Sequence, residues 1–309
     1  MGRPYPYLRG ESKLNRDRMV TVITFSSQRM NNSISPGRAV PRLLVSVRSL
    51  EEVAQAIRGG AHVVDVKEPA RGSLGMAEIG VIREIAAFLR DEIPAPSNSA
   101  NVPIDTDRPG DSPHETVPLS VALGELREWV GRRDVPALPD EVTFAKLGLS
   151  DTAGASEWQA EWQRLRHEFD RQRNVPLRWV AVAYADDAAA RSVPLDEVFP
   201  AAATSGCAGL LIDTFAKQGQ TLADFISVAK LAETVQRCHA AGMFLAIAGS
   251  LTIDSVQTFS DVNADIIAIR SAACRNANRC HAIDASRVAE FRAALSQAMG
   301  EETGSCRAF

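Results

Sequence analysis

The sequence has no long hydrophobic run and no strong excess of charge of either sign. Its 309 residues carry 34 basic and 38 acidic side chains, so the formal net charge is −4. No apolar stretch approaches the roughly 20 residues that a membrane-spanning helix needs. A nearly neutral balance gives no general attraction to nucleic acid or to an anionic membrane surface. We therefore expect a protein that binds neither nucleic acid nor membranes.

Cysteine is scarce, and its spacing carries little information. There are five cysteines, an odd number without close pairing. The run Cys274-x5-Cys280-His281 fits no common zinc motif, so neither a disulfide framework nor a metal site is predicted. The Arg- and Ser-rich first forty residues lack the apolar core and cleavage site of a secretory signal. These observations together predict reduced thiols in a cytoplasmic protein.

What the sequence does contain is a short apolar run followed by a helix-like segment, repeated along the chain. Eight such units in about 250 residues are typical of a (β/α)8 TIM barrel with parallel strands. A doubly wound open sheet is the alternative, but no Gly-x-Gly-x-x-Gly follows the first strand. The expected strands are 43–47, 63–67, 118–123, 142–148, 177–184, 209–213, 243–248 and 266–270. The expected helices include 49–58, 79–89, 125–131, 158–169, 194–203, 221–235 and 285–298.

Three segments fall outside this repeat. We expect a flexible or peripheral arm over 1–40, one catalytic barrel domain over 41–298, and a tail over 299–309. Within the barrel, residues 91–117 are rich in proline and have almost no apolar content. This composition predicts a loop insertion. Neither Met1 nor Met19 can be chosen as the true start on sequence grounds.

The stretch from Val63 to Gly75, VVDVKEPARGSLG, is the centre of the predicted site. Side chains alternate along a strand, so Asp65 and Lys67 are expected on the same side. An inward lysine is costly unless it is compensated, because an unpaired buried charge loses its hydration. A structural ion pair with Asp65 is the plain alternative to a catalytic role.

Other ionisable residues also follow the ends of expected strands. In a TIM barrel the active site lies at the carboxyl ends of the strands, so these side chains should meet. For Lys146 the alternative is an ion pair at the rim, and for Lys217 a solvated loop position. Asp213 could act as a base or orient a lysine. The residues concerned are Asp65, Lys67, Lys146, Tyr184, Asp186, Asp213, Lys217 and Arg270.

Two stretches suggest a phosphate site. Gly249-Ser250 follows the seventh strand and offers backbone N–H groups beside a helix start. Arg270-Ser271-Ala272 follows the eighth strand and adds a guanidinium and further amides. The loops after these two strands are the usual phosphate site of the fold, although ordinary helix capping would give a similar pattern.

Amines near carboxylates, beside a phosphate site, indicate carbonyl chemistry. A lysine is nucleophilic only when neutral, and burial or a second cation lowers its pKa enough to make this possible. Lys67 would form a Schiff base with the carbonyl of a sugar phosphate. Lys146 would lower the pKa of Lys67 or act as an acid or base, while Asp65 and Asp213 would carry protons.

Seven motifs together resemble the (5-formylfuran-3-yl)methyl phosphate synthase family of methanofuran biosynthesis. The resemblance covers about 41–295, and two of the motifs, DVK-P-x-x-GSLG and DT-x-x-K-x-G-x-T-L-x-D, are specific. The motifs are LLVSV at 43–47, VVDVKEPARGSLG at 63–75, AKLGL at 145–149, AYAD at 183–186, LLIDTFAKQGQTLADF at 210–225, LAIAGSL at 245–251 and IAIRSAACR at 267–275.

The resemblance implies a TIM-barrel lyase that condenses two molecules of glyceraldehyde 3-phosphate without a metal or organic cofactor. Lys67 matches the Schiff-base lysine, Lys146 and Lys217 match the other active-site lysines, and Asp65 matches the nearby carboxylate. Two other readings stay open: a Schiff-base aldolase or isomerase acting on a triose phosphate, and an inactive barrel that senses a phosphate ligand. The sequence leaves the oligomeric state open, a homo-oligomer included.

Overall fold

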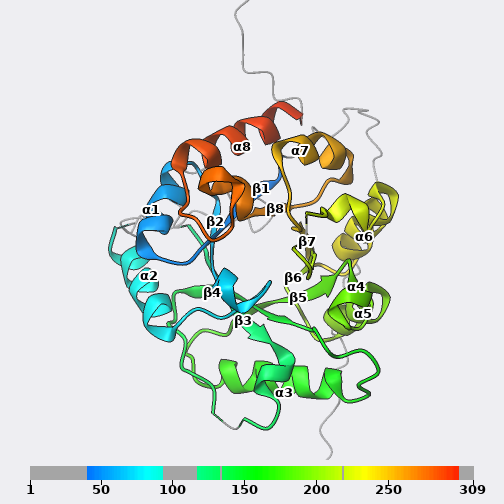
Figure 1. The fold of residues 1–309 in the computed structure, drawn as a ribbon. Coiled ribbons are helices and arrows are strands. Elements are labelled where there is room, and N and C mark those ends of the chain that lie inside the picture. The colour runs from blue at the N-terminus through cyan, green and yellow to red at the C-terminus, as the bar shows by residue number, and fades with distance from the viewer. Residues whose placement is uncertain (1–39, 93–116, 133, 218, 299–309) are drawn as a thin grey trace, which may run out of the picture. The chain divides into compact units, whose positions relative to one another are not determined.

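The described part of the chain forms a closed barrel of eight parallel strands, in the order β1 to β8, with β1 paired to β8. The computed structural model describes residues 40–92, 117–132, 134–217 and 219–298. Figure 1 shows the helices arranged around the outside of the strands. The predicted TIM barrel is confirmed. The expected arm, most of the insertion over 91–117 and the tail lie outside the described residues.

The strands and helices alternate as the sequence predicts. The strands are β1 (Arg42–Val47), β2 (Val63–Val66), β3 (Leu119–Glu125), β4 (Val142–Gly148), β5 (Arg178–Tyr184), β6 (Gly209–Asp213), β7 (Phe244–Ile247) and β8 (Ile266–Ile269). The α-helices are α1 (Leu50–Arg58), α2 (Ile79–Glu92), α3 (Trp158–Asp170), α4 (Asp187–Ala190), α5 (Leu195–Thr204), α6 (Val228–Ala240), α7 (Ile253–Phe259) and α8 (Ala285–Ala298). Short 3-10 helices are η1 (Pro69–Arg71), η2 (Leu126–Trp129), η3 (Leu222–Asp224), η4 (Ser260–Val262), η5 (Ser271–Ala273) and η6 (Arg275–Ala277).

The structure corrects two of the expected helices. A helix was expected over 125–131, but β3 continues through Glu125, which pairs with Gly148 of β4, and only the short η2 follows. Thr221 was expected to cap the helix over 221–235. It caps η3 instead, and α6 begins later because Ser227 accepts a hydrogen bond from the Lys230 amide at 3.2 Å. Capping groups that compete within one loop decide where a helix starts.

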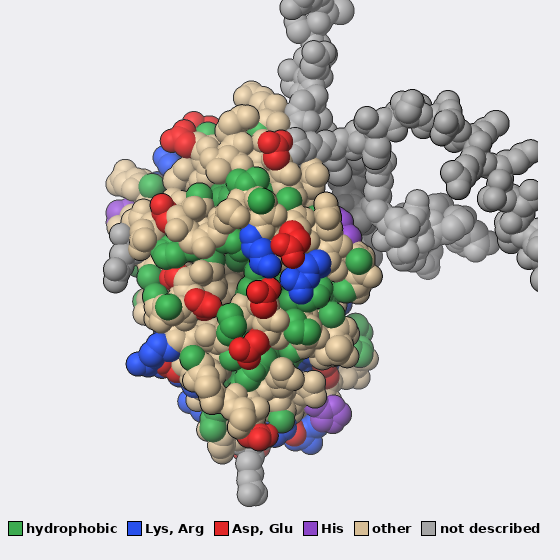
Figure 2. All heavy atoms as spheres, turned by 90° about the vertical axis from the view of Figure 1, so that its right-hand side faces the viewer, with side chains coloured by type: hydrophobic (Ala, Val, Ile, Leu, Met, Phe, Trp, Pro, Cys, Tyr) green, Lys and Arg blue, Asp and Glu red, His purple; other side chains and the backbone are tan. Residues whose placement is uncertain are grey.

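Figure 2 shows the face of the molecule that bears α5 and α6, on the right of Figure 1. Acidic and basic side chains lie close together on this face, among apolar and neutral ones. Ion pairs join the two helices, since Asp196 lies 3.4 Å from Lys230 and 3.5 Å from Arg237. None of the described helices is both long enough and apolar enough to span a membrane.

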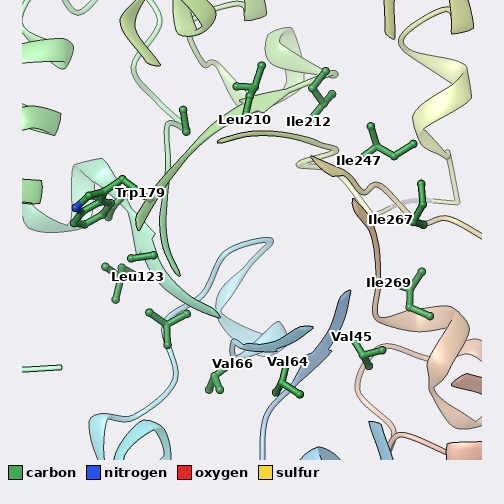
Figure 3. Close-up of a cluster of buried hydrophobic side chains, with 14 of the residues drawn as sticks. Val45, Val64, Val66, Leu123, Trp179, Leu210, Ile212, Ile247, Ile267 and Ile269 are labelled. Carbon is green, nitrogen blue, oxygen red and sulfur yellow. The ribbon is translucent and has the colours of Figure 1, made fainter. Parts of the chain in front are cut away.

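Most of the core lies between the ring of strands and the helices. Figure 3 shows ten labelled side chains, Val64, Val66 and Ile212 among them, that point outward from the ring. All ten are buried, with exposures between 0% and 5%. Because neighbouring side chains on a strand face opposite ways, the residues between them point into the barrel. Burying the branched side chains outside therefore directs Asp65 and Asp213 inward.

Candidate active site

Asp65 and Lys67 stand at the carboxyl end of β2 and face the interior of the barrel. Both are buried, with exposures of 1% and 8%. Ser46, the neighbour of Asp65 in the β1–β2 pairing, donates a hydrogen bond to its Oδ2 atom at 3.2 Å. Burial by itself would raise the pKa of Asp65, but the nearby Lys146 and Lys67 outweigh burial and hold this pKa below its usual value. Asp65 is therefore a carboxylate at neutral pH.

Two of the three predicted lysines form ion pairs with aspartates. The Nζ atom of Lys146, on β4, lies 2.5 Å from Oδ1 of Asp65. The Nζ atom of Lys217, in the loop after β6, lies 2.9 Å from Oδ1 of Asp213. The sequence predicted that Asp65 would pair with Lys67. In the structure Asp65 pairs instead with Lys146, which lies 81 positions away in the chain.

Lys67 lies between these two pairs. Among the described residues its amine makes no ion pair or hydrogen bond. Burial lowers its pKa from 10.5 to about 8; Asp213 and Asp65 oppose this shift, while Lys217 and Lys146 add to it. A sizeable share of the amine is therefore neutral near pH 8, as a lysine nucleophile requires.

Asp213 is fixed by groups from two loops. Its Oδ1 atom accepts the Thr214 amide at 2.8 Å, and the Ser73 hydroxyl lies 3.1 Å from its Oδ2 atom. Burial would raise the pKa of Asp213, but Lys217 and Lys67 lower it below the usual value. Ser73 belongs to the GSLG motif after β2, so this motif holds the carboxylate at the end of β6.

The amines line one cavity with two parts, which share residues such as Lys67 and Asp213. The inner part, about 480 Å³, lies within the barrel and has mainly apolar walls, including Leu44, Phe144 and Phe244. The outer part, about 430 Å³, lies among the loops that follow the strands. Besides the residues that it shares with the inner part, its lining includes Lys217, Gly249, Ser250, Arg270, Ser271 and Arg279.

The predicted phosphate residues do not all fit that role equally. Gly249, Ser250 and Ser271 line the outer part of the cavity, whereas Ala272 does not. Gly249 has a φ of +113°, which favours glycine, and Ser250 has a φ of +53°. The phosphate role of these residues stays a prediction.

Arg270 differs from expectation because protein groups occupy its guanidinium. It pairs with Glu52 of α1, with Nη2 3.1 Å from Oε1 and Nη1 2.5 Å from Oε2. The remaining donors reach the carbonyl oxygens of Ser46 at 2.9 Å, Arg279 at 2.9 Å and His281 at 3.2 Å. All five N–H groups of an arginine are thereby used. This guanidinium therefore has no free N–H group for the phosphate contact that was predicted from the sequence.

Tyr184 and Asp186 lie beside the cavity and do not line either part of it. The Tyr184 hydroxyl donates to Oε1 of Glu125 at 2.7 Å, and burial raises the pKa of this tyrosine well above 10. Both carboxylate oxygens of Asp186 accept backbone amides, from Phe215 at 2.7 Å and Ala216 at 2.8 Å. These contacts hold the loop that carries Lys217.

The family model described as 4-HFC-P synthase matches residues 43–292. The chain belongs to this family. It is 35% identical to the (5-formylfuran-3-yl)methyl phosphate synthase of Methanopyrus kandleri over 77% of this chain and 92% of the relative. It is 32% identical to the synthase of that name from Methanothermobacter thermautotrophicus, over 77% of this chain and 93% of the relative. The resemblance found in the motifs is confirmed, and the chain is a member of an enzyme family.

Solved structures support the fold as well. The barrel is similar to GGGPS from Thermoplasma volcanium, with a TM-score of 0.53 and 8% identity, over 85% of this chain and 93% of that one. At this identity the likeness concerns the fold alone.

The structure of this (5-formylfuran-3-yl)methyl phosphate synthase family member also brings to the site several residues to which no role was assigned from the sequence. Glu125 accepts the Ser150 amide at 2.9 Å as well as Tyr184, and it lies against Gly148, where a Cβ atom would overlap its carboxylate. Ser73 and Arg279 were also missed. The glycine of the AKLGL motif was a signal for a close contact, but it did not name the partner. No group of three or more His, Cys, Asp or Glu in the described ranges is placed to hold a metal ion.

Proposed function

We propose that this chain condenses two molecules of glyceraldehyde 3-phosphate into (5-formylfuran-3-yl)methyl phosphate through a Schiff base on Lys67. The observation that carries this proposal is the state of the three lysines. Lys146 and Lys217 each face an aspartate, whereas Lys67 has no such partner among the described residues and has a pKa of about 8. A lysine nucleophile needs these properties, because only its neutral form attacks a carbonyl.

In the first step, the neutral Lys67 amine attacks the aldehyde carbon of one triose phosphate. The carbinolamine then loses its hydroxyl as water, which requires a proton. The ammonium of Lys146 or Lys217, both of which affect the pKa of Lys67, would donate it. The resulting iminium withdraws electrons from the neighbouring carbon, so a carboxylate can remove the proton there and leave an enamine. We assign this role to Asp213, and its hydrogen bonds from Ser73 and the Thr214 amide support the assignment.

The enamine carbon then attacks the aldehyde of the second triose phosphate and forms the new carbon–carbon bond. A lysine ammonium protonates the alkoxide that develops. Elimination of one phosphate, ring closure, loss of water and cleavage of the bond to the Lys67 nitrogen lead to the free furan aldehyde and regenerate the amine. Overall, two triose phosphates give one furan aldehyde phosphate, one inorganic phosphate and two waters, so no oxidant or reductant is needed.

The second requirement is a place for phosphate. Gly249 and Ser250, just after β7, and Ser271, just after β8, line the outer part of the cavity. Loops after these strands commonly bind phosphate in this fold. This arrangement supports a substrate whose carbonyl reaches Lys67 while its phosphate stays at the mouth of the barrel.

Incubating the purified protein with glyceraldehyde 3-phosphate alone tests the proposal. We expect the ultraviolet absorbance of a conjugated furan aldehyde together with release of inorganic phosphate. Lys67→Ala should give neither, whereas Lys230→Ala, on the outer helix α6, should match the wild type. Consumption of triose phosphate without a furan would favour the aldolase or isomerase reading. No consumption, and no borohydride-trapped adduct on Lys67, would favour the phosphate sensor.

A further inference from the structure

Arg279 is a cavity residue to which the sequence assigned no function. It lies between η6 and α8, and its side chain lines the outer part of the cavity. Its Nη2 atom donates to the carbonyl oxygen of Gly72 at 2.9 Å, in the loop after β2. The side chain thus crosses from the β8–α8 connection toward the β2–α2 connection at the mouth of the barrel.

Arg279 makes no ion pair with the described residues. Lys217 pairs with Asp213, and Arg270 pairs with Glu52, but no carboxylate lies within ion-pair distance of Arg279. Its Nε atom is buried and has no hydrogen-bond acceptor. A buried N–H without an acceptor is unfavourable, so this guanidinium would gain free energy from a further anionic partner.

The backbone around Arg279 is held by Arg270. The Nε atom of Arg270 donates to the Arg279 carbonyl oxygen at 2.9 Å, and its Nη2 atom donates to that of His281 at 3.2 Å. The pairing of Arg270 with Glu52 anchors this arrangement to α1. The two arginines therefore have different tasks. Arg270 uses all its N–H donors on protein groups and supports the loop, whereas Arg279 lines the cavity and has N–H donors that no group of the described residues accepts.

We propose that Arg279 supplies the guanidinium that binds the substrate's phosphate monoester in the outer part of the cavity. This inference rests on the proposed function for the identity of the substrate, a phosphorylated small aldehyde. A phosphate offers several acceptors to one guanidinium. A role limited to bridging the loops would need only the single N–H that reaches Gly72.

Borohydride trapping of Lys67 tests the inference with two aldehydes, glyceraldehyde 3-phosphate and unphosphorylated glyceraldehyde. We expect Arg279→Met to slow trapping of the phosphorylated aldehyde about 10- to 100-fold, the effect of losing a charged hydrogen-bonding partner. Trapping of unphosphorylated glyceraldehyde should change less than about twofold. Arg279→Lys keeps the charge and much of the length of the side chain, so its trapping rate with the phosphorylated aldehyde should lie between those of the wild type and Arg279→Met. This variant replaces Arg279→Met in the test if the methionine variant does not fold.

Arg275→Met is the matched control, because Arg275 is an exposed arginine of the same connection and lies outside the cavity. It should trap both aldehydes as the wild type does. Equal slowing with both aldehydes in the Arg279 variants would mean a purely structural role and overturn the inference. Unchanged trapping of the phosphorylated aldehyde would overturn it as well.

Calorimetric titration with inorganic phosphate gives a readout that needs no lysine chemistry. We expect the wild type to bind phosphate at least about tenfold more tightly than Arg279→Met. Equal affinities, or no binding by the wild type, would overturn the inference. Neither measurement depends on furan formation: a wild type that binds phosphate through Arg279 but makes no furan would refute the proposed function and leave this inference standing.

Discussion

Lys67 owes its lowered pKa mainly to burial; Asp213 and Asp65 oppose this shift, while Lys217 and Lys146 add to it. The alternation of residues on β2 was enough to predict that Asp65 and Lys67 point inward. The sequence could not show that Asp65 would pair with Lys146, because that contact joins two strands 81 residues apart. In the same way, Ser73 and Asp213 meet across 140 residues. Motifs locate side chains along the chain, whereas partners depend on the closure of the barrel.

Imine formation should depend on pH through the amine of Lys67. This pKa of about 8 is lower than that of an exposed lysine, and the reactive form is the deprotonated one. The rate of borohydride trapping with triose phosphate should therefore rise about tenfold per pH unit below pH 8 and level off above it. A series of trapping rates from pH 6 to 10 measures this directly. A midpoint near 10.5, as for an exposed lysine, would contradict the assignment.

Removing the neighbouring cation should shift this profile. In Lys146→Met a positive charge that lowers the pKa of Lys67 is lost, and the carboxylate of Asp65 is left to interact with Lys67. The pKa of Lys67 should rise, so the midpoint of the trapping profile should move to higher pH. Lys230→Met, on the outside of α6, should leave the midpoint in place. An unmoved midpoint in Lys146→Met would exclude an electrostatic role for Lys146.

The connection from β6 to α6 shows what the pattern of strands and helices can and cannot predict. The strand end at Asp213 and the following loop were correct, because a buried apolar run ends there in polar residues. The predicted start of α6 at Thr221 was wrong, because Thr221 and Ser227 are both good capping residues and the helix begins after Ser227. The loop's conformation depends on Asp186, which follows a different strand, so no local pattern shows it.

Asp186→Asn should impair the enzyme by releasing the Lys217 loop. One oxygen becomes an amide NH2 group that faces a backbone N–H of Phe215 or Ala216, so a hydrogen bond is lost. Small displacements of a catalytic group reduce turnover strongly, and we expect kcat to fall about 10- to 100-fold. Asp187→Asn is the control, since among the described residues the Asp187 side chain accepts only the exposed amide of Ala188. Equal kcat values in the two variants would mean that Asp186 does not position Lys217.

The barrel as a whole was predictable because eight repeats of strand and helix leave few alternatives. The side-chain contact that strengthens the junction of its first and last strands was not predictable. The pairing of β1 with β8 is reinforced by Glu52 of α1 and Arg270 after β8, which are 218 residues apart and both buried. From the sequence, Arg270 had the appearance of a ligand-binding residue, because a guanidinium after β8 fits both tasks.

Arg270→Met should destabilise the whole barrel, because it leaves the buried Glu52 with only the partly exposed Arg48 as an ionic partner. Breaking a buried ion pair from one side costs about 3–5 kcal/mol. The double variant Glu52→Gln/Arg270→Met should recover part of this loss, since no unpaired charge remains. Denaturant unfolding of the wild type, both single variants and the double variant gives the coupling energy. Additive losses would show that the two residues do not stabilise the barrel as a pair.

The position of Lys67 between two ion pairs has a consequence for the heat of substrate binding. Three lysines share two aspartates here, so the proton on Lys67 depends on whatever else enters the cavity. A phosphate dianion favours the charged amine and draws a proton from the medium, whereas its departure returns that proton. Binding will then exchange protons with the buffer, and the measured enthalpy will vary with the ionisation enthalpy of that buffer. Loss of phosphate during the reaction would, by the same linkage, restore the neutral amine.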